Sequence, residues 1–162
     1  MKISIDQHVD VTPDVAAAAY ANPAFFEGRE PRENITVLGV PKREQSGDVV
    51  EMEVAFRFTG SISSAVRAVI DPAKMSWVTH STIDLAAGRS EWTIVPDHYP
   101  DRLTGHGTYT FSADGSGTVV HLEGDLKVNV FLVGRTVEGV IIAGLRKYFA
   151  AEVAGIPDVP SA

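Results

Sequence analysis

Residues 131–154 read FLVGRTVEGVIIAGLRKYFAAEVA, and the fold predicted for the rest of the chain depends on this stretch. Its apolar positions recur at the spacing of one helix face, whereas most of its charged residues fall elsewhere. The apolar positions are Val133, Val137, Val140, Ile141, Gly144, Leu145 and Tyr148, and the charged ones are Arg135, Glu138, Arg146, Lys147 and Glu152. Gly155 and Pro157 end the pattern, which predicts a helix of about 22–24 residues, roughly 33–36 Å long.

The chain ahead of this helix alternates between apolar and polar residues in the manner of about seven β-strands. We expect them over residues 3–9, 34–43, 50–58, 74–87, 89–96, 102–112 and 118–130. The clearest alternation places Val50, Met52, Val54, Phe56 and Phe58 on one face of a strand. The sequence ADGSG at residues 113–117 predicts a hairpin turn, and residues 60–70 predict a loop or a short helical excursion.

A second helical region follows the first strand. Thr12 is a capping residue and Pro13 suits the first helical position, so a short alanine-rich helix is expected to run to Tyr20. Asn22-Pro23 ends it, and a second short helix or turn is expected around residues 24–26. The order is therefore strand, short helix pair, antiparallel strands and one long terminal helix.

Composition narrows the class of protein. The 162 residues are 44% hydrophobic and 22% charged, which predicts one globular α+β domain over residues 1–156 and a frayed tail over 157–162. A formal net charge of −7 argues against binding to nucleic acid or to an anionic membrane surface. The absence of cysteine excludes disulfides and thiolate chemistry, and is compatible with a cytoplasmic location. No signal peptide is visible, and the most apolar stretch is too short for stable membrane insertion.

The long helix can bury its apolar face only if the antiparallel sheet bends strongly around it. At this point the chain resembles the START-like superfamily of polyketide cyclases, lipid-transfer proteins and birch-pollen allergens, whose fold is called a helix grip. The resemblance rests on the opening strand 2–9, the helix start TPDV at 12–15, the run GTYTF at 107–111, the strand GTVVHL at 117–122 and the terminal helix. Within that superfamily it is similar to a largely actinobacterial group called domain of unknown function 2505. The resemblance implies a fold more than an activity.

Motifs for catalysis or metal binding are missing from the sequence. It contains no HExxH, no GxSxG elbow and no phosphate-binding glycine loop, and its five histidines include no pair at i, i+4. His80 shares a strand face with Val78 and Thr82 that can point either way, and Asp97, His98 and Asp101 are best explained as a connecting loop. We therefore predict no catalytic residue, no metal site and no cofactor.

An apolar chamber between sheet and helix is the feature most suited to function. The residues expected to line or support it are Met52, Val54, Phe56, Phe58, Trp77, Thr79, Ser81, Trp92, Tyr109, Phe111, Val137, Val140, Ile141, Gly144 and Tyr148. Gly134, Gly139, Ala143 and Gly144 leave little side-chain volume on the helix, either to make room for a ligand or to permit close helix–sheet packing.

Three functions are compatible with this architecture. The first is binding of a small hydrophobic or amphipathic molecule, such as a lipid, isoprenoid or polyketide-like compound. The second is a protein-interaction module with a filled core, whose acidic surface would bind a protein partner. The third is an enzyme of cyclase or dehydratase type, which requires His80 or Tyr109 to point inward beside a carboxylate.

Overall fold

Two twelve-residue strands form the hairpin around which the sheet is built. In the computed structural model, β6 (Leu103–Asp114) pairs antiparallel with β7 (Gly117–Val128), from Leu103 opposite Val128 to Asp114 opposite Gly117. Gly115 makes the turn with a φ of +60°, a conformation that costs glycine little. The structure describes residues 1–27, 33–68, 70–129 and 134–160, with the side chains at 65, 66, 134–137 and 140 also outside the described part.

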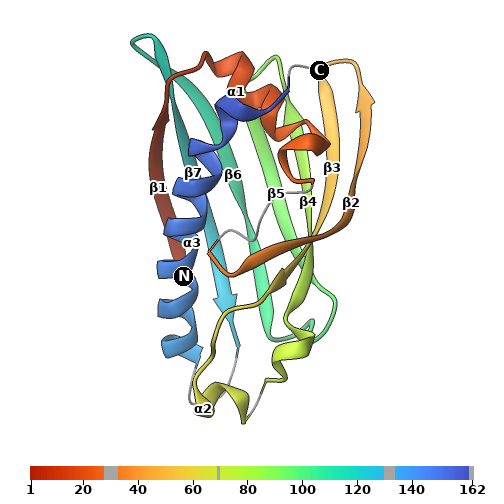
Figure 1. Ribbon diagram of the computed structural model, residues 1–162, viewed down its shortest axis with the longest axis vertical. Coiled ribbons are helices and arrows are strands. Elements are labelled where there is room, and N and C mark those ends of the chain that lie inside the picture. Colours follow the sequence, from red (N-terminus) through yellow and green to blue (C-terminus); the bar gives the residue numbers. More distant parts are fainter. Residues whose placement is uncertain (28–32, 69, 130–133, 161–162) are drawn as a thin grey trace.

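The hairpin belongs to a seven-stranded antiparallel sheet in the order β1-β7-β6-β5-β4-β3-β2. The remaining strands are β1 (Lys2–Val9), β2 (Ile35–Ser46), β3 (Val49–Phe58), β4 (Ser76–Asp84) and β5 (Arg89–Pro96). Figure 1 shows β1 and β2 as the two edges of this sheet. Because β1 joins the sheet beside β7, the first and last strands of the chain close one side of the molecule together.

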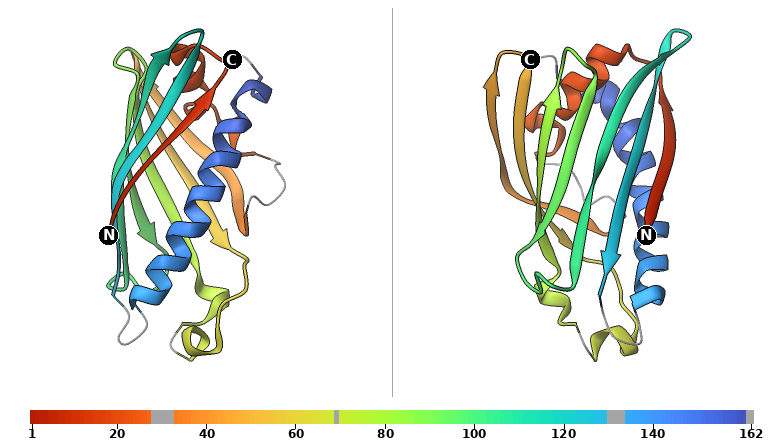
Figure 2. Two further views of the ribbon diagram at one scale, coloured as in Figure 1. Left: turned by 90° about the vertical axis from the view of Figure 1, so that its left-hand side faces the viewer. Right: turned by 180° about the vertical axis from the view of Figure 1, so that it is seen from behind.

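One long helix crosses the concave face of the sheet. It is α3 (Gly134–Ala154), and two shorter helices lie near its ends, α1 (Pro13–Tyr20) near its C-terminus and α2 (Ser64–Arg67) near its start (Figure 2). The described residues also form three 3₁₀ turns: η1 (Pro23–Phe25), η2 (Pro72–Lys74) and η3 (Ile156–Asp158). This arrangement is the helix grip that the sequence predicted.

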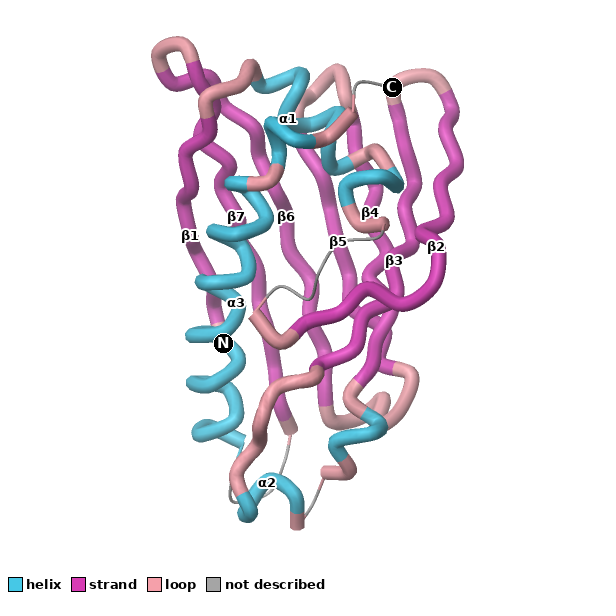
Figure 3. The backbone as a smooth tube through the Cα atoms, in the orientation of Figure 1, coloured by secondary structure: helices cyan, strands magenta, loops and turns pink. Residues whose placement is uncertain are grey.

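The β2 edge of the sheet bends where β2 loses its register with β3. The pairing of β2 with β3 shifts between Leu38 and Lys42, and Gly39 in this interval has a φ of +66°. Figure 3 shows the sharp change of direction in β2 that accompanies the irregularity. A bulge of this kind increases local twist and curls the sheet edge round the helix.

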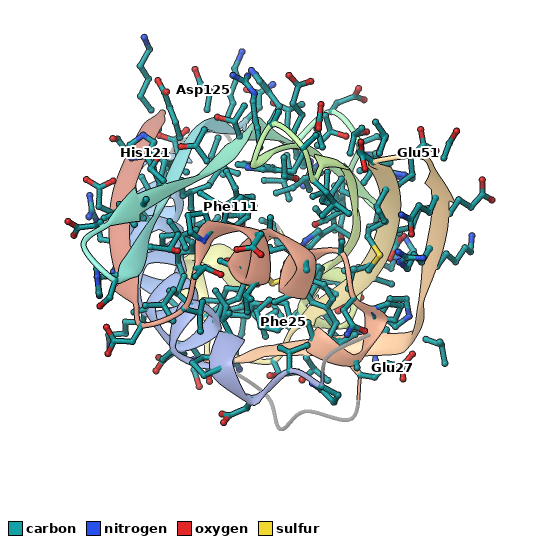
Figure 4. All side chains as sticks on the ribbon, turned by 90° about the horizontal axis from the view of Figure 1, so that it is seen from above. Phe25, Glu27, Glu51, Phe111, His121 and Asp125 are labelled. Carbon is teal, nitrogen blue, oxygen red and sulfur yellow. The ribbon has the colours of Figure 1, made fainter. Side chains whose placement is uncertain are left out.

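Strand parity agrees with the sequence pattern. Val50, Met52, Val54 and Phe56 of β3 are all buried, whereas Glu51 faces solvent. Figure 4 shows Phe111 and Phe25 toward the centre of the curled sheet and Glu51, His121 and Asp125 on its rim.

Trp92 lies over a patch of sheet that has no side chains. Trp92 pairs with Gly107, which pairs with Gly124, so the three residues form one row across β5, β6 and β7. A Cβ atom added at Gly107 would lie 2.6 Å from Trp92 Cζ2, and one at Gly124 would lie 2.8 Å from the same atom. The indole therefore packs directly on the backbone, which is the close packing that glycines within a strand indicate.

Several local expectations were wrong. The fourth strand begins at Ser76, two residues later than expected, because Asp71 caps η2 by accepting a hydrogen bond from the Ala73 backbone N–H. Of the tail expected over residues 157–162, Val159 packs against the core and the Pro160 carbonyl accepts a hydrogen bond from Asn22 Nδ2.

Two small residues of α3 do not face the sheet. Gly139 and Ala143 are both exposed. Gly134 and the expected helix start at residues 131–133 are outside the part of the chain for which side chains are described. No helix in the described ranges is both long enough and apolar enough to span a bilayer.

The row of Trp92 and its glycines makes a stability prediction. Gly107→Ala places a Cβ 2.1 Å from the Glu123 carbonyl oxygen, so we expect a loss of about 3 kcal/mol in the free energy of unfolding. The matched control is Gly139→Ala on α3, where a Cβ meets nothing within 4 Å and a gain of about 1 kcal/mol is expected. Urea unfolding followed by circular dichroism measures both, and a shift of the same sign in the two variants would contradict the packing argument.

Candidate functional site

A cavity of about 400 Å³ lies between the concave face of the sheet and α3. Its walls are mostly apolar side chains from β3 to β7 and from one face of the helix. The protein-interaction hypothesis required a core filled by side chains. The cavity shows that the core is not filled in this way.

Most of the residues predicted for the chamber do line this cavity. They are Met52, Val54, Phe56, Phe58, Trp77, Thr79, Ser81, Trp92, Tyr109, Ile141, Gly144 and Tyr148. Phe111 does not line it, because its ring packs against Tyr20 in the core, with 5.3 Å between ring centroids. The side chains of Val137 and Val140 lie outside the described residues.

Gly144 distinguishes the two explanations for glycine in the helix. It lines the cavity, and a Cβ built on it would meet no described atom within 4 Å apart from the helix's own backbone. A glycine required for close packing would show a neighbour at that distance, as Gly107 does. Open space therefore faces α3 at this position.

A buried carboxylate lies at the α1 end of the cavity. Glu152 lines the cavity although it is only 3% exposed, and the Tyr20 hydroxyl of α1 donates a hydrogen bond of 2.9 Å to its Oε2. Tyr109 reaches the same place from β6, and its ring centroid is 5.0 Å from that of Tyr20. Burying a carboxylate is costly unless polar groups surround it, and here phenols provide part of that surrounding.

The two phenols are held in their neutral form. Burial raises the pKa of Tyr20 well above its usual range, and the nearby negative charge of Glu152 raises it further. Tyr109 keeps some accessible surface because it lines the cavity, yet burial and then Glu152 raise its pKa in the same direction. Near neutral pH this end of the cavity therefore presents protonated phenols beside a carboxyl group.

The cavity also has charged side chains away from Glu152. Lys74 and Arg102, with His98, line it where β4 and β6 begin and β5 ends, and the acidic Glu33 lines it just before β2. The Arg102 guanidinium lies 5.0 Å from the centre of the Tyr99 ring, and the Tyr99 hydroxyl accepts a hydrogen bond from the backbone N–H of Asp71. These contacts connect the loop after β5 to η2 at the rim of the cavity.

His80, the histidine that the enzyme hypothesis named, does not face the cavity. His80 points away from the cavity, with its side chain 44% exposed and its Nδ1 3.4 Å from Glu53 Oε1. Across the described ranges, no cluster of three or more histidine and acidic side chains could hold a metal ion. Of the two inward residues that the enzyme hypothesis named, His80 is excluded and Tyr109 is retained.

Sequence reasoning missed Glu152 and Tyr20. Glu152 was counted among the charges of the outer helix face, although Ile141, Leu145, Tyr148 and Glu152 follow one another at intervals of four, three and four residues. That spacing places all four on one face of a helix, and it was the available signal. For Tyr20 the only signal was the end of a short helix, which does not say what the side chain meets.

The raised pKa values make a prediction for alkaline solution. The unfolded chain loses its tyrosine protons near pH 10, whereas Tyr20 and Tyr109 keep theirs in the folded protein. Their stabilisation is therefore complete below about pH 10 and is lost as the pH rises further. Absorbance at 295 nm should show both phenols ionising only as the chain unfolds. The rise in absorbance that accompanies unfolding should be smaller by one tyrosine in Tyr20→Phe and also in Tyr109→Phe. Full ionisation of wild-type tyrosines before unfolding would contradict this.

Solved structures of low sequence identity share this architecture. The chain matches the structure of TTHA0849 from Thermus thermophilus with 12% identity and a TM-score of 0.62, over 98% of this chain and 95% of that one. It matches the Zhui aromatase/cyclase from Streptomyces sp. R1128 with 11% identity and a TM-score of 0.63, over 98% and 93%. Norcoclaurine synthase from Thalictrum flavum, in complex with dopamine and hydroxybenzaldehyde, matches with 13% identity and a TM-score of 0.62, over 100% and 89%. At such identities the likeness shows the fold alone.

Sequence comparison gives the family. No curated protein matches the chain. A family model described as "Protein of unknown function (DUF2505)" matches residues 4–156, which is nearly the whole chain and runs from within β1 past the end of α3. The chain therefore belongs to this family, within the helix-grip fold of the START-like proteins.

Proposed function

We propose that this protein binds a small hydrophobic or amphipathic molecule, of lipid, isoprenoid or polyketide-like class, in the cavity between the sheet and α3. The observation that carries the proposal is open space beside Gly144, in a chamber whose walls are mainly apolar. Binding there removes apolar surface from water on both partners, worth about 25 cal/mol per Å² before the costs of association.

The proposed contacts are the described lining residues that the sequence predicted. Phe56 and Trp77 form a stacked pair with 5.7 Å between centroids, and Tyr148 meets Phe56 edge to face. These rings provide a rigid apolar wall, which loses little conformational entropy when a ligand binds. Thr79 and Ser81 of β4 also line the cavity, and their hydroxyls can orient a bound ligand by hydrogen bonding.

An enzyme of cyclase or dehydratase type is the second candidate, favoured by Tyr109 and Tyr20 beside Glu152. A carboxyl group next to phenols in an enclosed chamber can hold or transfer a proton. The similar folds of an aromatase/cyclase and of norcoclaurine synthase are compatible with this candidate but do not choose it.

Native mass spectrometry of the purified protein, followed by organic extraction, tests the leading proposal. We expect a small-molecule adduct that is lost on denaturation, and uptake of the neutral dye Nile red by protein freed of it. If the extracted molecule is returned to fresh protein and recovered unchanged, the protein is a carrier. Conversion to a product would favour the enzyme.

Two leucine substitutions on the same helix locate the binding site. Gly144→Leu projects a side chain into the cavity and should weaken Nile red binding at least about tenfold, whereas Gly139→Leu on the exposed face should leave it unchanged. Both variants replace glycine by a better helix former, so both should gain helix stability. Equal binding by wild type and Gly144→Leu, or no adduct and no dye uptake by wild type, would overturn the proposal.

A further inference from the structure

Glu152 makes one end of the apolar cavity chemically distinct. The residue is 3% exposed, yet its carboxylate forms part of the wall, with Tyr20 Oη 2.9 Å from its Oε2. Its neighbours on the last turns of α3 are apolar and almost fully buried: Phe149, Val153 and Ile156 in the following turn are each 1% exposed. A carboxyl group in such surroundings is ionised only at considerable cost, which hydrogen-bond donors such as the Tyr20 hydroxyl offset in part.

Helix packing does not require a charge at this position. Tyr20 is already held by rings, at 5.1 Å from Phe25 and 5.3 Å from Phe111 between centroids. The buried Tyr20 hydroxyl does need an acceptor, but a neutral amide at position 152 would supply one without desolvating a charge. An ionisable carboxyl group is therefore more than the packing of Tyr20 requires.

The buried carboxyl group lies far from the cationic side chains that line the cavity. Lys74 and Arg102 line the cavity at the end where β6 begins, and the acidic Glu33, just before β2, also lines it. Tyr109, beside Glu152, is six residues further along β6 than Leu103, a separation of about 20 Å. A ligand inside thus meets a buried carboxyl group at one end, apolar walls along its body and charged side chains of both signs elsewhere in the lining.

Resting on the proposed function, we propose that the ligand carries a neutral hydrogen-bond-donating hydroxyl, phenol or alcohol, on an apolar body. The hydroxyl enters first and donates to the Glu152 carboxylate, while Tyr20 acts as a positioning residue that holds the carboxylate toward the cavity. A ligand whose leading group is an anion would be rejected at this end, because two negative charges would face one another where water is excluded.

Three naphthalene probes of nearly the same shape test this assignment: 2-naphthol, 2-methylnaphthalene and 2-naphthoate. Competition with Nile red at neutral pH gives a dissociation constant for each. Wild type should bind 2-naphthol about 10–100-fold more tightly than 2-methylnaphthalene, the range expected for a hydrogen bond to a charged group, and should bind 2-naphthoate most weakly.

Variants assign the preference to Glu152. In Glu152→Met the naphthol-to-methylnaphthalene ratio should fall to near unity while 2-methylnaphthalene binding is kept, and the penalty against naphthoate should disappear. Glu152→Gln keeps an acceptor oxygen without the charge, so it should retain part of the naphthol preference and also accept naphthoate. Glu91→Met, which removes an exposed glutamate from β5, is the control and should behave as wild type.

The outcomes separate the two proposals. If wild type binds 2-methylnaphthalene as tightly as 2-naphthol, or if Glu152→Met keeps the full preference, the hydroxyl assignment is wrong while cavity binding stands. If wild type takes up neither Nile red nor either neutral probe, the proposed function fails and the assignment fails with it. The ratio of the 2-naphthol and 2-methylnaphthalene dissociation constants of wild type tests the hydroxyl assignment by itself, even if a variant does not fold.

Discussion

The structure depends on how one helix packs into a sheet that curves away from it. The inward side chains of the C-terminal turns of α3 are buried, with Phe149 and Val153 each 1% exposed. In the middle of the helix, Ile141, Leu145 and Tyr148 are only partly buried. The helix contacts β1 and β7 most, at one side of the sheet. Because the other strands curl beyond its reach, the middle of the helix faces a cavity of about 400 Å³.

Rigid elements keep this space open. The Trp92 indole lies on the bare backbone of Gly107 and Gly124 and stiffens the floor of the sheet, while Tyr20 joins α1 to α3 through rings and through the hydrogen bond to Glu152. Protein interiors usually fill their voids, so a persistent cavity requires walls whose side chains cannot move inward. The same contacts that stabilise the fold therefore preserve the chamber that the proposed function uses.

The inward face of each strand was predictable because alternation is a local property. Met52, Val54 and Phe56 could be assigned to the cavity from one strand alone, and Trp92 and Tyr109 from their own strands. Phe111 shares the parity of Tyr109, yet it packs on Tyr20 instead of lining the cavity. Parity says which side of a sheet a residue faces, but not whether a helix covers that part of the sheet.

The order of the elements and the apolar character of the interior could be predicted from the amino-acid sequence, since each follows from periodicity within short segments. The buried position of Glu152, the outward direction of His80 and the open space beside Gly144 became evident from the folded structure. The reason is that these outcomes depend on contacts between segments far apart in the chain, such as Tyr20 and Glu152, which are 132 positions apart. A local pattern records the face of an element, whereas the neighbour that meets this face is set by the whole fold.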